Sequence, residues 1–158
     1  DAFCKWQKED SPSYQLVLAG ADEGLLLDLQ NKIDNANLND VVHFTGFLKG
    51  EEKRQAYSSA DLLVIPSRSE AMSLVVLEAG VLGIPMLATD KCGLNDFAKL
   101  KCGWICSASS EGIYSGLVEF SKADDKLLRG QNIKTYVTEN YGWSKLIPKY
   151  SELYETIT

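Results

Sequence analysis

Apolar and polar positions along the chain define two alternating kinds of segment. Short apolar runs closed by glycine, proline or polar residues predict buried β-strands, at residues 14–19, 41–44, 62–65, 84–88 and 104–106. Segments with helical periodicity predict helices, near residues 25–33 and at 51–59, 73–82, 111–121, 124–140 and 144–158. The first ten residues have the pattern of a helix that is ending.

Strands and helices that alternate in this way indicate βαβ units, and hence a parallel sheet with helices on both faces. The predicted fold class is therefore α/β, a doubly wound (Rossmann-like) parallel sheet that forms one domain over residues 1–158. Its strands look continuously apolar, which is typical of strands buried on both faces. Ligands of such sheets bind beyond the carboxyl ends of the strands, so the loops of interest are residues 20–24, 45–50, 67–73 and 89–95.

Composition narrows the function classes. The chain has 158 residues, of which 45% are hydrophobic and 24% charged, so a core can form without a disulfide or a metal. A net charge of −6 and the absence of any stretch rich in Lys and Arg argue against nucleic-acid binding, although a small diphosphate ligand stays open. Four cysteines without a C-x-x-C pair, and a single histidine, give no zinc-ligand spacing; free thiols in a reducing cytosol are expected.

The segment at residues 61–89 contains two candidate functional carboxylates. Glu70 lies in the loop after the third predicted strand, and Glu78 lies in the next helix, among residues that are otherwise apolar or glycine. A carboxylate in such a helix needs a partner, because burying an unpaired charge is costly. The partner is either a ligand, such as a sugar diol donating to both carboxylate oxygens, or a lysine; composition alone slightly favours a lysine or a solvated helix edge. A lone loop glutamate such as Glu70 is by default solvated.

The start of the same helix is a third candidate. The free N–H groups and partial positive charge of a helix N-terminus suit a diphosphate, and they would stabilise it as a leaving group. Ser73 is placed to cap this helix, which is a common structural role and is compatible with anion binding nearby.

This stretch resembles a known family, the retaining group-one glycosyltransferases of GT-B architecture. The C-terminal domain of that family carries E-G-F-G-L-V-x-L-E-A and then G-x-P-V-V-A-T. This chain reads E-A-M-S-L-V-V-L-E-A from Glu70 to Ala79 and G-I-P-M-L-A-T from Gly83 to Thr89. The likeness extends over residues 13–158, because VVHFTGFLKGEEKRQAYSSADLLVIPS and YGWSKLIPKYSELYE also resemble the family. It implies that the chain is the nucleotide-sugar-binding half of a two-domain enzyme.

The resemblance assigns roles to individual residues. Glu70 matches the glutamate that contacts the donor sugar near the reacting carbon, so it is the expected catalytic residue. Glu78 matches the glutamate that binds the ribose hydroxyls of the nucleotide. The remaining donor-binding positions match Ala71, Met72, Ser73 and Leu74 near the sugar and diphosphate, Phe47 and Leu48 beside the base, and Gly20 at the end of the first strand. Ala71 and Ser73 stand where the family has glycine, so the sugar contacts are expected to differ in detail.

The resemblance also implies the activity of the intact protein: a hexosyltransferase that moves a sugar from a UDP- or GDP-sugar to an acceptor hydroxyl with retention. No metal or cofactor is expected, and the products would be cell-surface polysaccharides or glycolipids. The chain is expected to be a fragment, inactive alone, that lacks the first βα unit with its phosphate-binding Arg/Lys pair and the N-terminal acceptor domain. A cytoplasmic location is expected, with any peripheral membrane association made by the missing part. A GT-B sugar-nucleotide epimerase and a non-catalytic nucleotide-binding module stay open as alternatives.

Several residues outside this segment have structural interpretations. Trp104 is predicted to lie in the core, and His43 in the core or at a strand edge. Tyr141 and Trp143 are predicted to anchor the last helix to the sheet. The loop from Cys92 to Asp96 departs from the family pattern, and no role is assigned to it.

Overall fold

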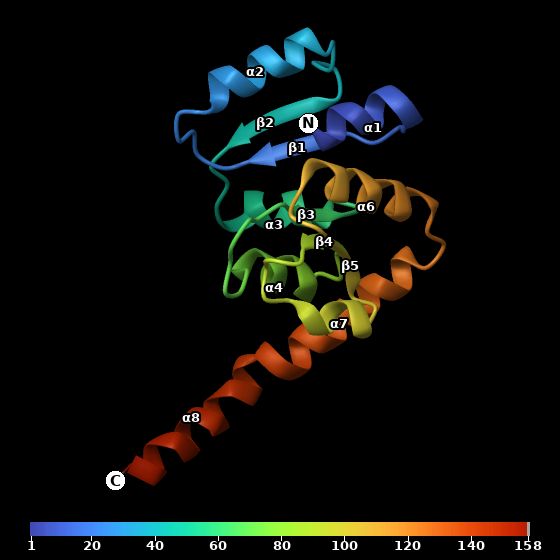
Figure 1. Cartoon of the computed structure of the whole chain (residues 1–158). Helices are drawn as coiled ribbons and strands as arrows, with labels where there is room; N and C mark the ends of the chain where they lie inside the picture. Colours follow the sequence, from blue (N-terminus) through green and yellow to red (C-terminus); the bar gives the residue numbers. More distant parts are fainter. Residues whose placement is uncertain (158) are drawn as a thin grey trace.

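The structure, a computed structural model, describes residues 1–157 without the side chains of Asn95 and Ile157; Thr158, in the last predicted helix, lies outside the described residues. Strands and helices alternate along the chain (Figure 1), which confirms the predicted α/β class. The strands are β1 (Leu16–Ala19), β2 (Val42–Gly46), β3 (Leu63–Ile65), β4 (Met86–Thr89) and β5 (Gly103–Cys106). The helices are α1 (Ala2–Asp10), α2 (Leu26–Asn35), α3 (Gly50–Ser58), α4 (Leu74–Val81), α5 (Asn95–Lys99), α6 (Ser110–Lys122), α7 (Lys126–Tyr141) and α8 (Trp143–Ile157).

The centre of the molecule is a parallel sheet in the order β3-β4-β5. Leu63 of β3 pairs with Met86 of β4, and Leu87 of β4 pairs with Trp104 of β5. The pairing runs along these strands without a register shift. All four residues of β4 are buried, because β4 has a strand on each side and helices on both faces. The continuous apolar pattern predicted this burial correctly.

Two apolar clusters cover the two faces of this sheet. Helices α1 and α6 pack together on one face, over a cluster formed by Trp6, Leu87, Trp104, Leu117 and Phe120. Helices α4 and α7 pack together on the other face, and α5 lies beside β5. Their cluster comprises Ile65, Val76, Met86, Ala88, Cys92, Leu94, Phe97, Cys102, Ile133 and Val137. The core position predicted for Trp104 is confirmed, since this side chain is 4% exposed.

Strands β1 and β2 form a separate two-stranded parallel sheet, in which Leu16 pairs with Val42. Here the prediction of strands buried on both faces is wrong. Partly buried and exposed residues alternate along β1, Val17 is 52% exposed, and His43 is exposed at the surface of β2. The physical reason is that, among the described residues, no helix packs closely over β1 or β2, whereas helices pack on β4 and β5.

The end of the chain also differs from expectation. Helix α8 contacts α7 and projects away from the body of the molecule (Figure 1). Trp143 is 75% exposed, so the predicted anchoring of α8 to the sheet by Trp143 is wrong, whereas the Tyr141 ring packs 5.9 Å from that of Tyr136. Within residues 1–157, no helix combines the length and the apolar character needed to cross a membrane.

Candidate functional site

The loop that carries Glu70 joins the carboxyl end of β3 to α4. Two interactions with the end of β4 and the residues after it hold this loop in place. The Thr89 hydroxyl donates to the carbonyl oxygen of Ser67, and the Glu70 amide donates to the Lys91 carbonyl oxygen at 2.9 Å. Thr89 is 1% exposed, so this support comes from the protein interior. Glu70 is thus fixed at the end of the sheet where ligands of doubly wound folds bind.

The loop after β4 provides a second support, through Gly93. Its φ of +66° is in the left-handed region, and a Cβ atom built on it would collide with the carbonyl oxygen of Ala71. Glycine is the residue that tolerates both conditions. No role was expected for this loop from its sequence. In the structure the Glu70 loop packs against it, and Gly93 is the sequence feature that could have indicated this contact.

Glu70 itself is partly buried, and its Oε2 atom is buried without a hydrogen-bond partner among the described residues. The default interpretation of a solvated loop glutamate is therefore wrong for this oxygen. A buried carboxylate oxygen is costly unless a donor reaches it. Glu70 therefore carries one strong acceptor that no described protein group satisfies.

Helix α4 begins at Leu74, shortly after Glu70 in the chain. Ser73 occupies its N-cap position and is 1% exposed, yet the Ser73 side chain makes no capping hydrogen bond. The predicted capping by the hydroxyl is therefore wrong, and the first-turn N–H groups keep their capacity to bind an anion. Met72 and Leu74 lie at the surface, 37% and 70% exposed, so the helix is not buried on all sides as its composition indicated.

Glu78 lies one turn further along α4 and has protein partners. The Lys53 ammonium lies 2.7 Å from Oε1 and also 2.7 Å from Oε2, and the Tyr57 hydroxyl donates to Oε2 at 3.0 Å. Burial, and then the hydrogen bond to Glu78, raise the pKa of Tyr57 to about 12, so it remains a donor at neutral pH. Of the two partners left open by the sequence, a lysine is present. The Glu78 side chain is still 42% exposed, so a ligand can also reach it.

Lys53 and Tyr57 were missed because nothing in the sequence links α3 to α4. They lie four residues apart on α3, which places both side chains on one face of that helix. Glu78 also lines a shallow apolar groove of about 310 Å³, together with Leu77, Val81, Val137, Thr138, Tyr141 and Gly142.

The other predicted donor-binding residues lie at the carboxyl ends of β1 and β2. The Gly20 amide donates to the Gly46 carbonyl oxygen at 2.9 Å, which ties these two strand ends together. Phe47 is 72% exposed and Leu48 is partly buried, directly before α3 begins. The predicted donor-binding residues thus form two separate groups in the structure, one around Gly20 and Phe47 and one around Glu70. Helix α3 connects them, because it follows Phe47 and holds Glu78 through Lys53.

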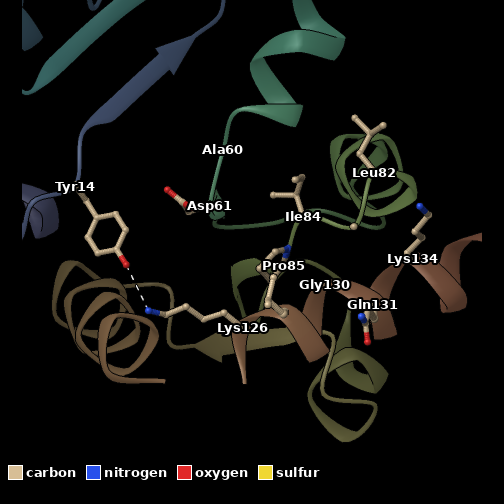
Figure 2. A pocket seen from close by; sticks show the side chains of 12 residues that line it. Tyr14, Ala60, Asp61, Leu82, Ile84, Pro85, Lys126, Gly130, Gln131 and Lys134 are labelled. Atoms are coloured by element: carbon tan, nitrogen blue, oxygen red, sulfur yellow. Dashed lines mark hydrogen bonds between the residues drawn. The ribbon is translucent and has the colours of Figure 1, made fainter. Parts of the chain in front are cut away.

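A larger cavity of about 470 Å³ lies at the opposite, amino-terminal ends of the strands (Figure 2). Tyr14 lies just before β1, Asp61 just before β3, and Pro85 just before β4. Lys126 of α7 reaches across this space to the Tyr14 hydroxyl, at 3.4 Å. The predicted donor-binding residues do not line this cavity.

Comparisons with known proteins agree on one family. Residues 1–133 match the model of the family described as glycosyl transferases group 1. The chain is 51% identical to the sulfoquinovosyl transferase of Arabidopsis thaliana over 53 residues, which is 34% of this chain and 10% of that protein. It is 26% identical to the N-acetyl-alpha-D-glucosaminyl L-malate synthase of Bacillus anthracis over 157 residues, covering 97% of this chain and 40% of that protein.

Solved structures give the same fold. Anabaena HepE, solved in complex with UDP and glucose, superposes with a TM-score of 0.84 at 18% identity, over 99% of this chain and 43% of HepE. At that identity the likeness establishes the doubly wound fold. The chain spans less than half the length of each of these three proteins.

Proposed function

Because this chain belongs to the group 1 glycosyltransferase family, we propose that it is the donor-binding domain of a retaining hexosyltransferase, which uses a UDP- or GDP-sugar. In the intact protein the sugar would pass to an acceptor hydroxyl of a growing cell-surface polysaccharide or glycolipid. HepE supports a nucleotide-sugar donor, because it was solved with UDP and glucose. A cytoplasmic location is part of the proposal, supported by the free thiols of Cys4, Cys92, Cys102 and Cys106.

The observation that carries this proposal is the unpartnered, buried Oε2 of Glu70 at the carboxyl end of β3. If the Glu70 side chain turns toward the ligand, hydroxyl groups of a donor sugar would donate to this oxygen and relieve its desolvation. A carboxylate held in place there can also stabilise positive charge that develops at the anomeric carbon as the bond to the diphosphate breaks. The acceptor would then attack from the face that the diphosphate leaves.

Two further features complete the proposed donor site. The first turn of α4, with no side-chain cap at Ser73, would receive the diphosphate and lower the need for a metal ion or a cofactor. The nucleotide would lie toward α3, with its base near Phe47 and Leu48, its ribose at Glu78, and Gly20 beside the pocket. Ala71, Met72 and Leu74 would line the path of the sugar and diphosphate.

The proposal extends to a βα unit outside residues 1–158. The Leu16 amide donates to Val41 and the Leu63 amide donates to Pro85, so these groups face β2 and β4. Successive peptide groups of a strand point to opposite sides. The backbone N–H and C=O groups of Val17 therefore point to the side of β1 away from β2, and those of Val64 to the side of β3 away from β4. One more parallel strand between β1 and β3 would join both sheets into a single doubly wound sheet.

The connections around this gap fit such a strand. Helix α1 leads into β1, and a strand before α1 would complete a βαβ unit. The cavity between Tyr14, Asp61 and Lys126 lies at the amino-terminal end of the same gap, where an added strand would enter. Further phosphate-binding side chains would come from this unit, and the acceptor site from a separate domain.

Calorimetry with UDP, GDP and their glucose conjugates tests the donor proposal. We expect weak binding by this chain, and Glu78→Gln should lower nucleotide affinity about tenfold or more, since it removes a charged acceptor. Glu70→Gln should instead reduce the preference for the sugar-bearing form. Glu119→Gln, on the exposed side of α6, is the matched control. Equal binding by all four proteins would remove the assignments, and a sugar-independent affinity would favour a nucleotide-binding module. Acceptor-independent turnover by the intact protein would favour an epimerase.

A further inference from the structure

The contacts of Glu78 single out two residues of α3 for a role in donor recognition. Lys53 and Tyr57 place three short contacts on one carboxylate: two from the ammonium, at 2.7 Å each, and one from the phenol, at 3.0 Å. Both side chains come from a single face of α3, and α3 follows directly on the loop that contains Phe47. The position of the Glu78 carboxylate is therefore set by α3, the helix that begins directly after the loop containing Phe47.

Stability alone is a weak reason for this arrangement. The Lys53 and Glu78 side chains are 37% and 42% exposed, and ion pairs with that much access to water contribute little to folding. A carboxylate that served only as the partner of Lys53 would not need the Tyr57 hydroxyl as well. What the two contacts achieve together is a fixed orientation, since they restrain the rotation of the Glu78 side chain from two positions.

That orientation leaves one oxygen better able to accept. A carboxylate has roughly four acceptor positions. Oε1 accepts the hydrogen bond from Lys53 and Oε2 accepts the one from Tyr57; the Lys53 ammonium also lies 2.7 Å from Oε2, so Oε2 is the more crowded oxygen. A ribose hydroxyl that donates to Oε1 would also displace water from the Glu78 carboxylate. The positive charge of Lys53 would offset the free-energy cost of that desolvation.

We propose that Lys53 and Tyr57 are positioning residues that hold Glu78 so that Oε1 accepts one hydroxyl of the donor's ribose. This rests on the proposed function, because it takes the ligand of Glu78 to be a ribonucleotide. If so, the discrimination of ribose from deoxyribose depends on the two residues of α3. Lys53 then stays paired with Glu78 when the nucleotide is bound, as it is in the free protein.

The test compares UDP and GDP with their 2′-deoxy and 3′-deoxy forms by calorimetry. Wild type should bind the ribonucleotide about tenfold or more tightly than the analogue lacking the recognised hydroxyl. Lys53→Met should lose most of this ratio, Tyr57→Phe part of it, and Lys53→Arg should retain it. Arg54→Met is the matched control, because Arg54 lies on the same helix and pairs with exposed Glu51. Thermal unfolding of each variant checks that it folds.

The outcomes separate the two proposals. If Lys53→Met weakens ribo and deoxy forms equally, Lys53 is merely structural and the positioning proposal is wrong. If Lys53→Met tightens ribonucleotide binding, Lys53 competes with the ribose, and the proposal is again overturned. If wild type binds the ribonucleotide but does not distinguish the deoxy forms, the ribose assignment fails while nucleotide binding stands. No binding of either nucleotide by wild type would overturn the donor function and the positioning role together.

Discussion

In the three-stranded half of the molecule, β4 has a hydrogen-bonded strand on each side, a helical layer on each face, and four buried residues. In the two-stranded half, β1 has one neighbour, and Val17 and Ala19 are exposed. Both strands are short apolar runs in the sequence. The difference teaches that burial depends on the helices that pack over a strand, which an apolar run does not encode.

The candidate site draws on both halves. Glu70 and the start of α4 belong to the buried half, where Thr89 holds their loop from the interior and Gly93 packs against Ala71. Gly20 and Phe47 belong to the exposed half, and α3 links it to Glu78 through Lys53. In the proposed donor site, the sugar end would then be rigid and the nucleotide end less supported, since local stability tracks buried contacts.

The largest expected effect on stability is in the buried half, the three-stranded sheet with its covering helices. Leu87→Ala should lower the free energy of unfolding by about 2–5 kcal/mol, because Leu87 is 1% exposed and its loss leaves a cavity between the sheet and α6. Leu18→Ala, the same change in partly buried β1, should cost clearly less. Urea denaturation of both variants measures the difference. Equal losses would show that the two halves are equally packed and would break the comparison.

The sequence predicted the fold class well because its signals are local. Apolar runs and helical periods located five strands and most helices. Helix α5 escaped because five residues are too few to show a period. The exposure of Trp143 could not be predicted, because an amphipathic helix has the same pattern whether or not its apolar face is covered.

The sequence selected only part of the candidate site, for the same reason. Glu70 and Glu78 stand in one contiguous motif, so resemblance was enough to select them. Lys53 and Tyr57 act on Glu78 from 25 and 21 residues away in the chain, and only the packing of α3 on α4 reveals the contact. The support from Gly93 depends on a backbone angle, which the sequence suggests only through the presence of a glycine.

An intermediate effect is expected at Gly93. Gly93→Ala should lower the free energy of unfolding by about 1–3 kcal/mol, since it adds strain at positive φ to a collision with Ala71. The matched control is Gly46→Ala in the exposed half, where φ is +69° but no atom lies within 4 Å of the new Cβ. Gly46→Ala isolates the strain, so its cost should be the smaller. Urea denaturation gives both values. A larger cost at Gly46 would show that the close packing between the loop after β3, which contains Ala71, and the loop after β4, which contains Gly93, contributes little to stability.

The smallest effect is expected at Val17, and it sharpens the comparison most. Val17→Thr in this chain should change the free energy of unfolding by no more than about 0.5 kcal/mol, because the side chain is 52% exposed on an edge strand. If a strand from outside residues 1–158 fills the gap beside β1, the same substitution in a chain extended at its amino end should cost more, since Val17 would then pack against a cross-strand neighbour. Amide hydrogen exchange at Val17 and Val64 should slow in the extended chain for the same reason. Unchanged exchange at both residues would show that the two edges stay open and that the sheets are independent.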